Sequence, residues 1–203
     1  MALPEHVLEY AMWSSETNPF DPMEKAIHQL YATTAATDKR MLFQQIHEYP
    51  IGGTPPMMTH IFKDEKGEVI IAAKGAPEGI LKQTKLSVAA LKQIEEQVLA
   101  YAKSGYRVLG VGKGSWHEHK WPVSQNEFEF EFLGLIVFYD PPKENIRETI
   151  NTFHEAGIQV KMITGDYPET AVAIADEIQL NHNRQVLTGK EVLHISKEEL
   201  QER

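Results

Sequence analysis

The segment Asp140-Pro141-Pro142-Lys143 separates two parts of the chain that have different sequence patterns. Each proline fixes its own φ angle and lacks an amide donor, so neither a helix nor a central strand continues through this segment. Residues 1–139 predict a mainly antiparallel sheet flanked by helices, whereas residues 140–203 predict alternating strands and helices. We therefore expect an α/β protein of two domains, 1–139 and 140–203, with a hinge at 140–143.

Residues 1–139 contain both helical and strand patterns in mixed order. Apolar residues recur at helical spacing near the start, and Asp21 followed by Pro22 is typical of a capped helix start. Runs of β-branched and aromatic residues, separated by glycine-containing turns, indicate strands. The predicted helices cover 3–13, 22–31, 77–81 and 88–104, and the predicted strands cover 41–49, 59–62, 69–73, 106–111 and 127–139.

The second part predicts a partial doubly wound domain. Its helices are expected over 144–156 and 168–179 and from Ser196, and its strands over 158–163 and near Val186. Because strands that alternate with helices pair in parallel, this pattern predicts a parallel sheet.

Composition excludes several classes of protein. The chain has 203 residues, of which 42% are hydrophobic, so it is long enough to bury a core. Its formal net charge is -9, with 20 basic residues scattered among 29 acidic ones, which argues against a nucleic-acid partner. It has no cysteine, which fits a reducing compartment. The longest apolar run, 132–139, is too short to span a bilayer, so we expect a soluble chain that makes no membrane contact.

The segment Lys74-Gly75-Ala76-Pro77-Glu78 follows the apolar strand predicted at 69–73. Gly75 has no Cβ, which would let a ligand approach the backbone, and the Lys74 ammonium suits a phosphate or an adenine edge. A surface lysine before a proline-initiated helix would look the same. This segment alone leaves both interpretations open.

Thr164-Gly165-Asp166 follows the strand predicted at 158–163, where open α/β sheets place their ligand crevice. The Thr164 hydroxyl and the adjacent amides at a helix N-terminus could bind a phosphate. Asp166 and Glu169 also fit a capping box, with Pro168 in the first turn, and that role needs no ligand.

Taken together, these segments resemble the P-type cation-transporting ATPases, ion pumps that form an aspartyl-phosphate. Residues 132–143 are similar to the family's strand that leads into Asp-Pro-Pro-Arg, with Lys143 in place of the arginine, and Val160–Asp166 is similar to its Ile-Thr-Gly-Asp segment. The likeness covers roughly 21–189. It implies a nucleotide-binding domain followed by part of a haloacid-dehalogenase-like phosphorylation domain, on the cytoplasmic face of a membrane.

The resemblance implies that the chain binds ATP, with Mg²⁺ accompanying the nucleotide in the intact pump. It places Asp21 and Glu24 at the adenosine end, Tyr49 against the adenine, Lys74 and Gly75 along the pocket, Arg107 toward the phosphates, and Thr164 and Asp166 beside the phosphoryl group. Glu24 could instead lie on a solvated helix face, Tyr49 in the core, and Arg107 on the surface of a strand.

Two departures from the family pattern affect this interpretation. The segment after Tyr49, Pro50-Ile51-Gly52-Gly53-Thr54-Pro55-Pro56-Met57, lacks the usual basic residues, so a second pocket lysine is lost and nucleotide affinity is expected to be low. The Ser-Glu-His-Pro signature of the heavy-metal branch is absent, which favours the calcium, proton or magnesium-like branches.

We expect this chain to present ATP to an aspartate that it does not contain, because no Asp-Lys-Thr-Gly-Thr segment is present. Alone it should be inactive, and its partners should be the remaining phosphorylation, actuator and transmembrane domains of the same polypeptide. A stand-alone phosphohydrolase of the haloacid-dehalogenase type and a nucleotide-independent regulatory module remain as alternatives. We predict no metal site, since His117 and His119 lack a third ligand nearby.

Overall fold

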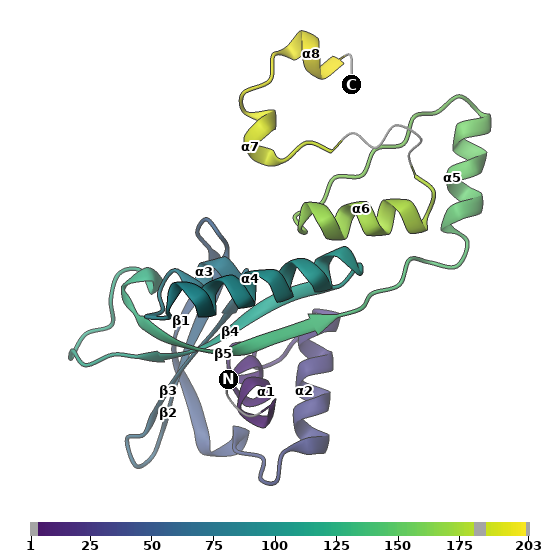
Figure 1. Ribbon diagram of the computed structural model, residues 1–203. Helices are drawn as coiled ribbons and strands as arrows, with labels where there is room; N and C mark the ends of the chain where they lie inside the picture. Colours follow the sequence, from purple (N-terminus) through teal and green to yellow (C-terminus); the bar gives the residue numbers. More distant parts are fainter. Residues whose placement is uncertain (1–3, 181–185, 202–203) are drawn as a thin grey trace. The chain divides into compact units, whose positions relative to one another are not determined.

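The computed structural model describes residues 4–180 and 186–201 (Figure 1). The chain divides into two compact units. The first comprises the residues up to Val98 together with Val108–Phe138, and the second comprises Leu99–Arg107 together with the residues from Tyr139 onward.

The first unit is built on a five-stranded sheet with the strand order β1-β2-β3-β4-β5. The neighbouring pairs β1–β2, β2–β3 and β3–β4 are antiparallel, as the sequence predicts for this part of the chain. The strands are β1 (Phe43–Gly52), β2 (Met57–Asp64), β3 (Val69–Gly75), β4 (Arg107–Ser115) and β5 (Glu129–Phe138).

Helices cover both faces of this sheet (Figure 1). Helices α1 (Pro4–Trp13) and α2 (Pro22–Thr34) pack on one face, and α3 (Pro77–Leu81) and α4 (Val88–Lys103) lie on the other. Two short 3₁₀ helices, η1 (Arg40–Leu42) and η2 (Gln125–Glu127), precede β1 and β5. The sequence predicts all four α-helices to within a few residues of these bounds.

Two apolar clusters lie on the two faces. The cluster beneath α1 and α2 centres on Trp13, whose ring lies 4.8 Å from that of Phe62 on β2. The opposite cluster contains Ile80 of α3, together with Phe128 and Phe130. Because side chains alternate along a strand, each face of the sheet contributes every second residue to one cluster.

A β-bulge in β1 changes which of its side chains reach each face. Gln45 pairs with Phe62 but His47 pairs with Ile61, so Ile46 is the extra residue. Phe62 belongs to the cluster under α1 and α2, whereas Ile61 belongs to the opposite cluster. The bulge therefore moves His47 and the residues that follow it to the face opposite to the one that an unbroken alternation would give them.

The second unit is mainly helical. Its helices are α5 (Ile146–Glu155), α6 (Pro168–Glu177), α7 (Gly189–Val192) and α8 (Lys197–Gln201), and a small apolar cluster contains Ile150, Ile178 and Leu180. The predicted helices correspond to α5, α6 and α8. The Ser196 hydroxyl accepts a hydrogen bond from the amide of Glu199 and so caps α8, at the residue where the sequence predicts this helix to begin.

The strand predicted over 158–163 was wrong, whereas the one expected near Val186 borders residues 181–185, which lie outside the described residues. The parallel sheet expected in this part of the chain is not shown by the described residues. Among the described residues, no strand follows β5. Ile163 is 97% exposed, and Ile158 is half exposed. A strand needs a neighbour to satisfy its amides and carbonyls, and no described segment supplies one here, so the apolar pattern alone does not produce a strand.

None of the helices in the described part of the chain is both long enough and apolar enough to cross a membrane.

Candidate functional site

The ammonium group of Lys74, at the end of β3, lies in a buried polar cluster beneath α1 and α2. Its Nζ donates to Glu24 Oε1 at 2.6 Å, to the Ser14 carbonyl oxygen at 2.6 Å and to Ser15 Oγ at 3.1 Å. An ammonium has three N–H donors, and all three are used. Lys74 and Glu24 are 5% and 8% exposed, so this is a buried ion pair.

Helix α1 contributes to the environment of Lys74. It ends at Trp13, and the carbonyl of Ser14 follows directly, so the ammonium lies at the negative end of the helix dipole. Burial lowers the pKa of Lys74, while the hydrogen bond to Glu24 opposes that shift. The charge of Lys74 is therefore stabilised by Glu24, Ser14 and Ser15 and not by water.

Asp21 and Glu24 are positioned by the start of α2. The carboxylate of Asp21 accepts hydrogen bonds from the amides of Met23 and Glu24, at 2.9 and 3.2 Å, which confirms the predicted N-cap. This cap orients the first turn of α2, from which Glu24 reaches Lys74. Glu24 Oε2 also accepts the amide of Glu16 at 3.3 Å, so one carboxylate links α2 to the segment after α1.

Gly75 lies against the neighbouring strand. A Cβ at this position would come within 2.5 Å of both the Met57 Cα and the Pro56 carbonyl oxygen. The space next to its backbone is thus filled by the start of β2. Gly75 has no side chain, and this allows β3 to lie close to the start of β2.

Tyr49 and Lys74 lie on opposite faces of the sheet. Tyr49 pairs with Thr59, which pairs with Ala73, so Tyr49 shares a face with Ala73 and not with the next residue, Lys74. Tyr49 is 8% exposed, and its hydroxyl donates to the Pro122 carbonyl oxygen at 2.6 Å. Its ring makes an edge contact with Phe128. The structure therefore brings Glu24 to Lys74 but does not bring Tyr49 to them.

Arg107, Thr164 and Asp166 form a second group, within the second unit. Arg107 binds Asp166 with two nitrogens, Nε to Oδ1 at 2.8 Å and Nη2 to Oδ2 at 3.2 Å. The Thr164 hydroxyl donates to Asp166 Oδ2 at 2.9 Å. The capping box that offered an alternative role for Asp166 is not formed: the N-cap of α6 is Tyr167, and the Asp166 carboxylate binds Arg107.

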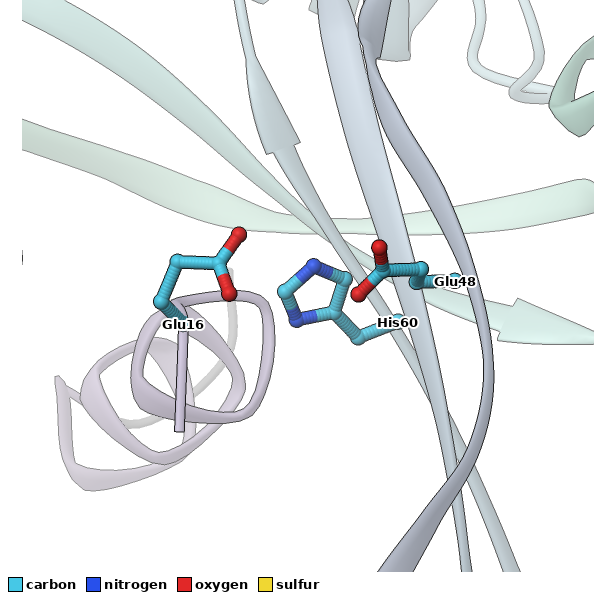
Figure 2. A group of neighbouring side chains, drawn as sticks. All are labelled: Glu16, Glu48 and His60. Carbon is cyan, nitrogen blue, oxygen red and sulfur yellow. The ribbon is translucent and has the colours of Figure 1, made fainter. Parts of the chain in front are cut away.

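A third group was missed by sequence reasoning. It contains Glu16, between α1 and α2, Glu48 on β1 and His60 on β2, whose ligand atoms all lie within 4.8 Å of one another. Figure 2 shows both carboxylates directed toward the imidazole ring. Glu48 and His60 are direct cross-strand partners, a relationship that depends on the register of the β1–β2 hairpin. No local motif in the sequence marks it.

Two hollows in the surface of the first unit lie apart from these groups. They are lined by residues of β3, β4 and β5 and of the segments that follow β4 and precede α4, and none of the predicted site residues lines either of them. Neither of these two hollows therefore marks the predicted site.

Comparison with known families assigns the chain to a class of proteins. Residues 20–145 match the family described as P-type ATPase, cytoplasmic domain N, and this chain belongs to that family. The matched region contains Glu24, Tyr49 and Lys74 and ends just after the double-proline segment.

Its relatives include P-type pumps of different ion specificity. The chain is 33% identical to the sodium/potassium exporting P-type ATPase cta3 of Schizosaccharomyces pombe over 76% of its own length and 17% of the relative's. It is 30% identical to a calcium-transporting ATPase of Bacillus subtilis over 78% of its length and 19% of the relative's. The chain thus spans about a fifth of the length of the curated relatives it matches.

Proposed function

We propose that this chain binds ATP in a P-type cation pump and presents it to a phosphorylatable aspartate located elsewhere in a longer polypeptide. The observation that carries this proposal is the buried Lys74–Glu24 pair, which lies within the matched region. The proposed arrangement has a nucleotide-binding domain over 1–139, part of a phosphorylation domain over 140–203, and a hinge at 140–143. The remaining phosphorylation, actuator and transmembrane domains are the proposed partners, at the cytoplasmic face of a membrane.

The Lys74 ammonium, a hydrogen-bond donor, and the Glu24 carboxylate, an acceptor, together suit the base of a nucleotide. A carboxylate accepts hydrogen bonds from an exocyclic amino group, and an ammonium donates to ring nitrogens. Because all three Lys74 donors are engaged, nucleotide binding must replace one of its protein acceptors. Ser15 is the best candidate, since its contact is the longest of the three and its hydroxyl also donates to the Ala11 carbonyl oxygen. This exchange supports the expectation of low affinity.

The other predicted residues take different parts in this proposal. Asp21 acts through the helix start that orients Glu24. Tyr49 could stack on adenine only after releasing Pro122, because its ring is packed against Phe128. Arg107 is proposed to exchange Asp166 for the nucleotide phosphates, with Thr164 beside them. Mg²⁺ is proposed to arrive with the phosphates, where it would neutralise their charge.

The transported ion is proposed to be a cation outside the heavy-metal group. The names of the relatives include sodium/potassium exporters as well as calcium transporters. The candidate ions therefore include sodium and potassium in addition to those of the calcium, proton and magnesium-like branches that the sequence favours.

An NMR titration of the chain with MgATP tests the proposal. We expect saturable shifts at Glu24, Lys74 and Gly75, and about a tenfold or greater loss of affinity when both charges are removed in Lys74→Met, Glu24→Gln. The matched control is Lys85→Met, because Lys85 forms an exposed ion pair with Glu129. Absence of saturable binding would support a nucleotide-independent module instead, and phosphate release by this chain would support a phosphohydrolase.

A further inference from the structure

We propose that Glu16, Glu48 and His60 form a binding site for a divalent metal ion of the zinc type. Each residue offers one ligand atom, and the three atoms lie within 4.8 Å of one another (Figure 2). The site lies in the first unit, on the face of the sheet that α1 and α2 cover. It does not depend on nucleotide binding.

The imidazole of His60 supplies an independent observation in favour of a ligand. His60 is completely buried, yet its Nε2 has no hydrogen-bond partner. A buried polar atom without a partner costs on the order of 1–3 kcal/mol, so its presence calls for an explanation. His28 also has a buried Nε2 without a partner, but within the described residues only His60 belongs to a group of three potential metal ligands.

The other ring nitrogen of His60 is held in a way that suits metal binding. Nδ1 lies 3.2 Å from the carbonyl oxygen of Ser15, and a carbonyl can only accept, so Nδ1 carries the proton. This leaves the lone pair of Nε2 free. A histidine that binds a metal usually donates its second nitrogen to a carbonyl or carboxylate in this way, which fixes the tautomer and the ring orientation.

The two carboxylates are held beside the ring by their own contacts. Glu48 is the direct cross-strand partner of His60. Gln45 connects Glu48 to the segment after α1, because its Nε2 donates to Glu48 Oε2 at 2.8 Å and its Oε1 accepts from Thr17 at 2.9 Å. The amide of Glu16 is bound by Glu24. Three chain segments therefore meet at one point with their ligands already near one another.

Charge and geometry favour a divalent cation. Two carboxylates and a neutral imidazole carry a charge of −2, and the nearby Lys74 cation is already paired with Glu24. One nitrogen and two oxygen ligands form a donor set that binds Zn²⁺ at about 2.0–2.2 Å, and a water molecule would supply the fourth ligand. Ligand atoms around such an ion lie about 3.4 Å apart, so small rotations of the solvent-accessible carboxylates would complete the site. Imidazole favours zinc-type ions over Mg²⁺.

The test follows the histidine side chains of the metal-free chain by long-range ¹H–¹⁵N NMR during addition of ZnCl₂. The chain has nine histidines, so the signal must be specific to one of them. We expect the Nε2 resonance of His60 to move saturably with Zn²⁺ and to stay unchanged with MgCl₂, while Nδ1 stays protonated. An unmoved His60 resonance at zinc saturation would overturn the proposal.

Variants of the carboxylates give a second measurement, by calorimetric zinc titration. Glu48→Gln and Glu16→Gln should each weaken zinc binding at His60 by about tenfold or more. Both side chains are solvent-accessible, so these variants should fold. Glu118→Gln is the matched control, since Glu118 lies between two other histidines in sequence. Equal zinc affinity at His60 in Glu48→Gln, Glu16→Gln and the unsubstituted chain would contradict the site.

Discussion

The ammonium of Lys74 lies 2.6 Å from the carboxylate of Glu24, fifty residues earlier in the chain, and both side chains are buried. This ion pair joins the end of β3 to the first turn of α2. It makes Lys74 a structural residue as well as a candidate ligand contact, so stability and nucleotide binding must be measured separately in any variant of the pair.

The single variant Lys74→Met should be strongly destabilising, because it leaves the Glu24 charge buried without a cation. Breaking a buried pair typically costs about 3–5 kcal/mol. Adding Glu24→Gln removes the unpaired charge and should recover most of that loss. Urea denaturation measures both, with Lys85→Met as a control, because loss of an exposed pair should change stability by less than about 1 kcal/mol. A double variant no more stable than Lys74→Met would contradict this account.

Gly75→Ala should destabilise the first unit by about 1–3 kcal/mol, since its Cβ would overlap the backbone of β2, which cannot move aside cheaply. Gly52→Ala is the control. There the nearest atom to a new Cβ is 3.7 Å away, an ordinary contact, so little change is expected. Thermal unfolding of the two variants checks the difference, and equal midpoints would argue against close strand packing at Gly75.

Tyr49→Phe should lower stability by about 1 kcal/mol, because it removes the hydrogen bond to the Pro122 carbonyl oxygen and keeps the ring. If Tyr49 leaves this position to stack on adenine, the variant should also bind ATP more tightly, since that hydrogen bond no longer has to be broken. Parallel denaturation and ATP titration measure the two effects. An unchanged ATP affinity with reduced stability would assign Tyr49 to the core alone.

Tyr10 should make stability fall at high pH. Burial, together with the negative charges of Glu9, Glu131 and Glu68, raises its pKa from 10.0 to about 12. Between these two values the unfolded chain releases the proton while the folded chain keeps it, so this contribution to stability is complete below pH 10 and is lost as pH rises toward 12.

Urea midpoints measured below and above pH 10 check the Tyr10 prediction. Tyr10→Phe should lose less stability over that interval than the unsubstituted chain, because phenylalanine does not titrate. An identical loss in both would rule out Tyr10 as the source.

Much of the first unit could be predicted from the sequence because its signals are local. Asp21 and Pro22 mark a helix start through contacts within one turn, and the continuous apolar run of β3 reflects burial of both faces of the sheet. The strand expected over 158–163 was wrong because an apolar pattern records a preference for burial, while a strand also requires a paired neighbour.

The sequence by itself determined the helices of the first unit, the approximate positions of its strands and the cap of α2, since each depends on residues close together in the chain. Tertiary structure decided which of these residues meet. The extra residue Ile46 in β1 places Tyr49 on the face away from Lys74, and the β1–β2 register sets Glu48 beside His60. A one-residue shift in pairing reverses the face of every later side chain, and that register is fixed by packing across the whole sheet.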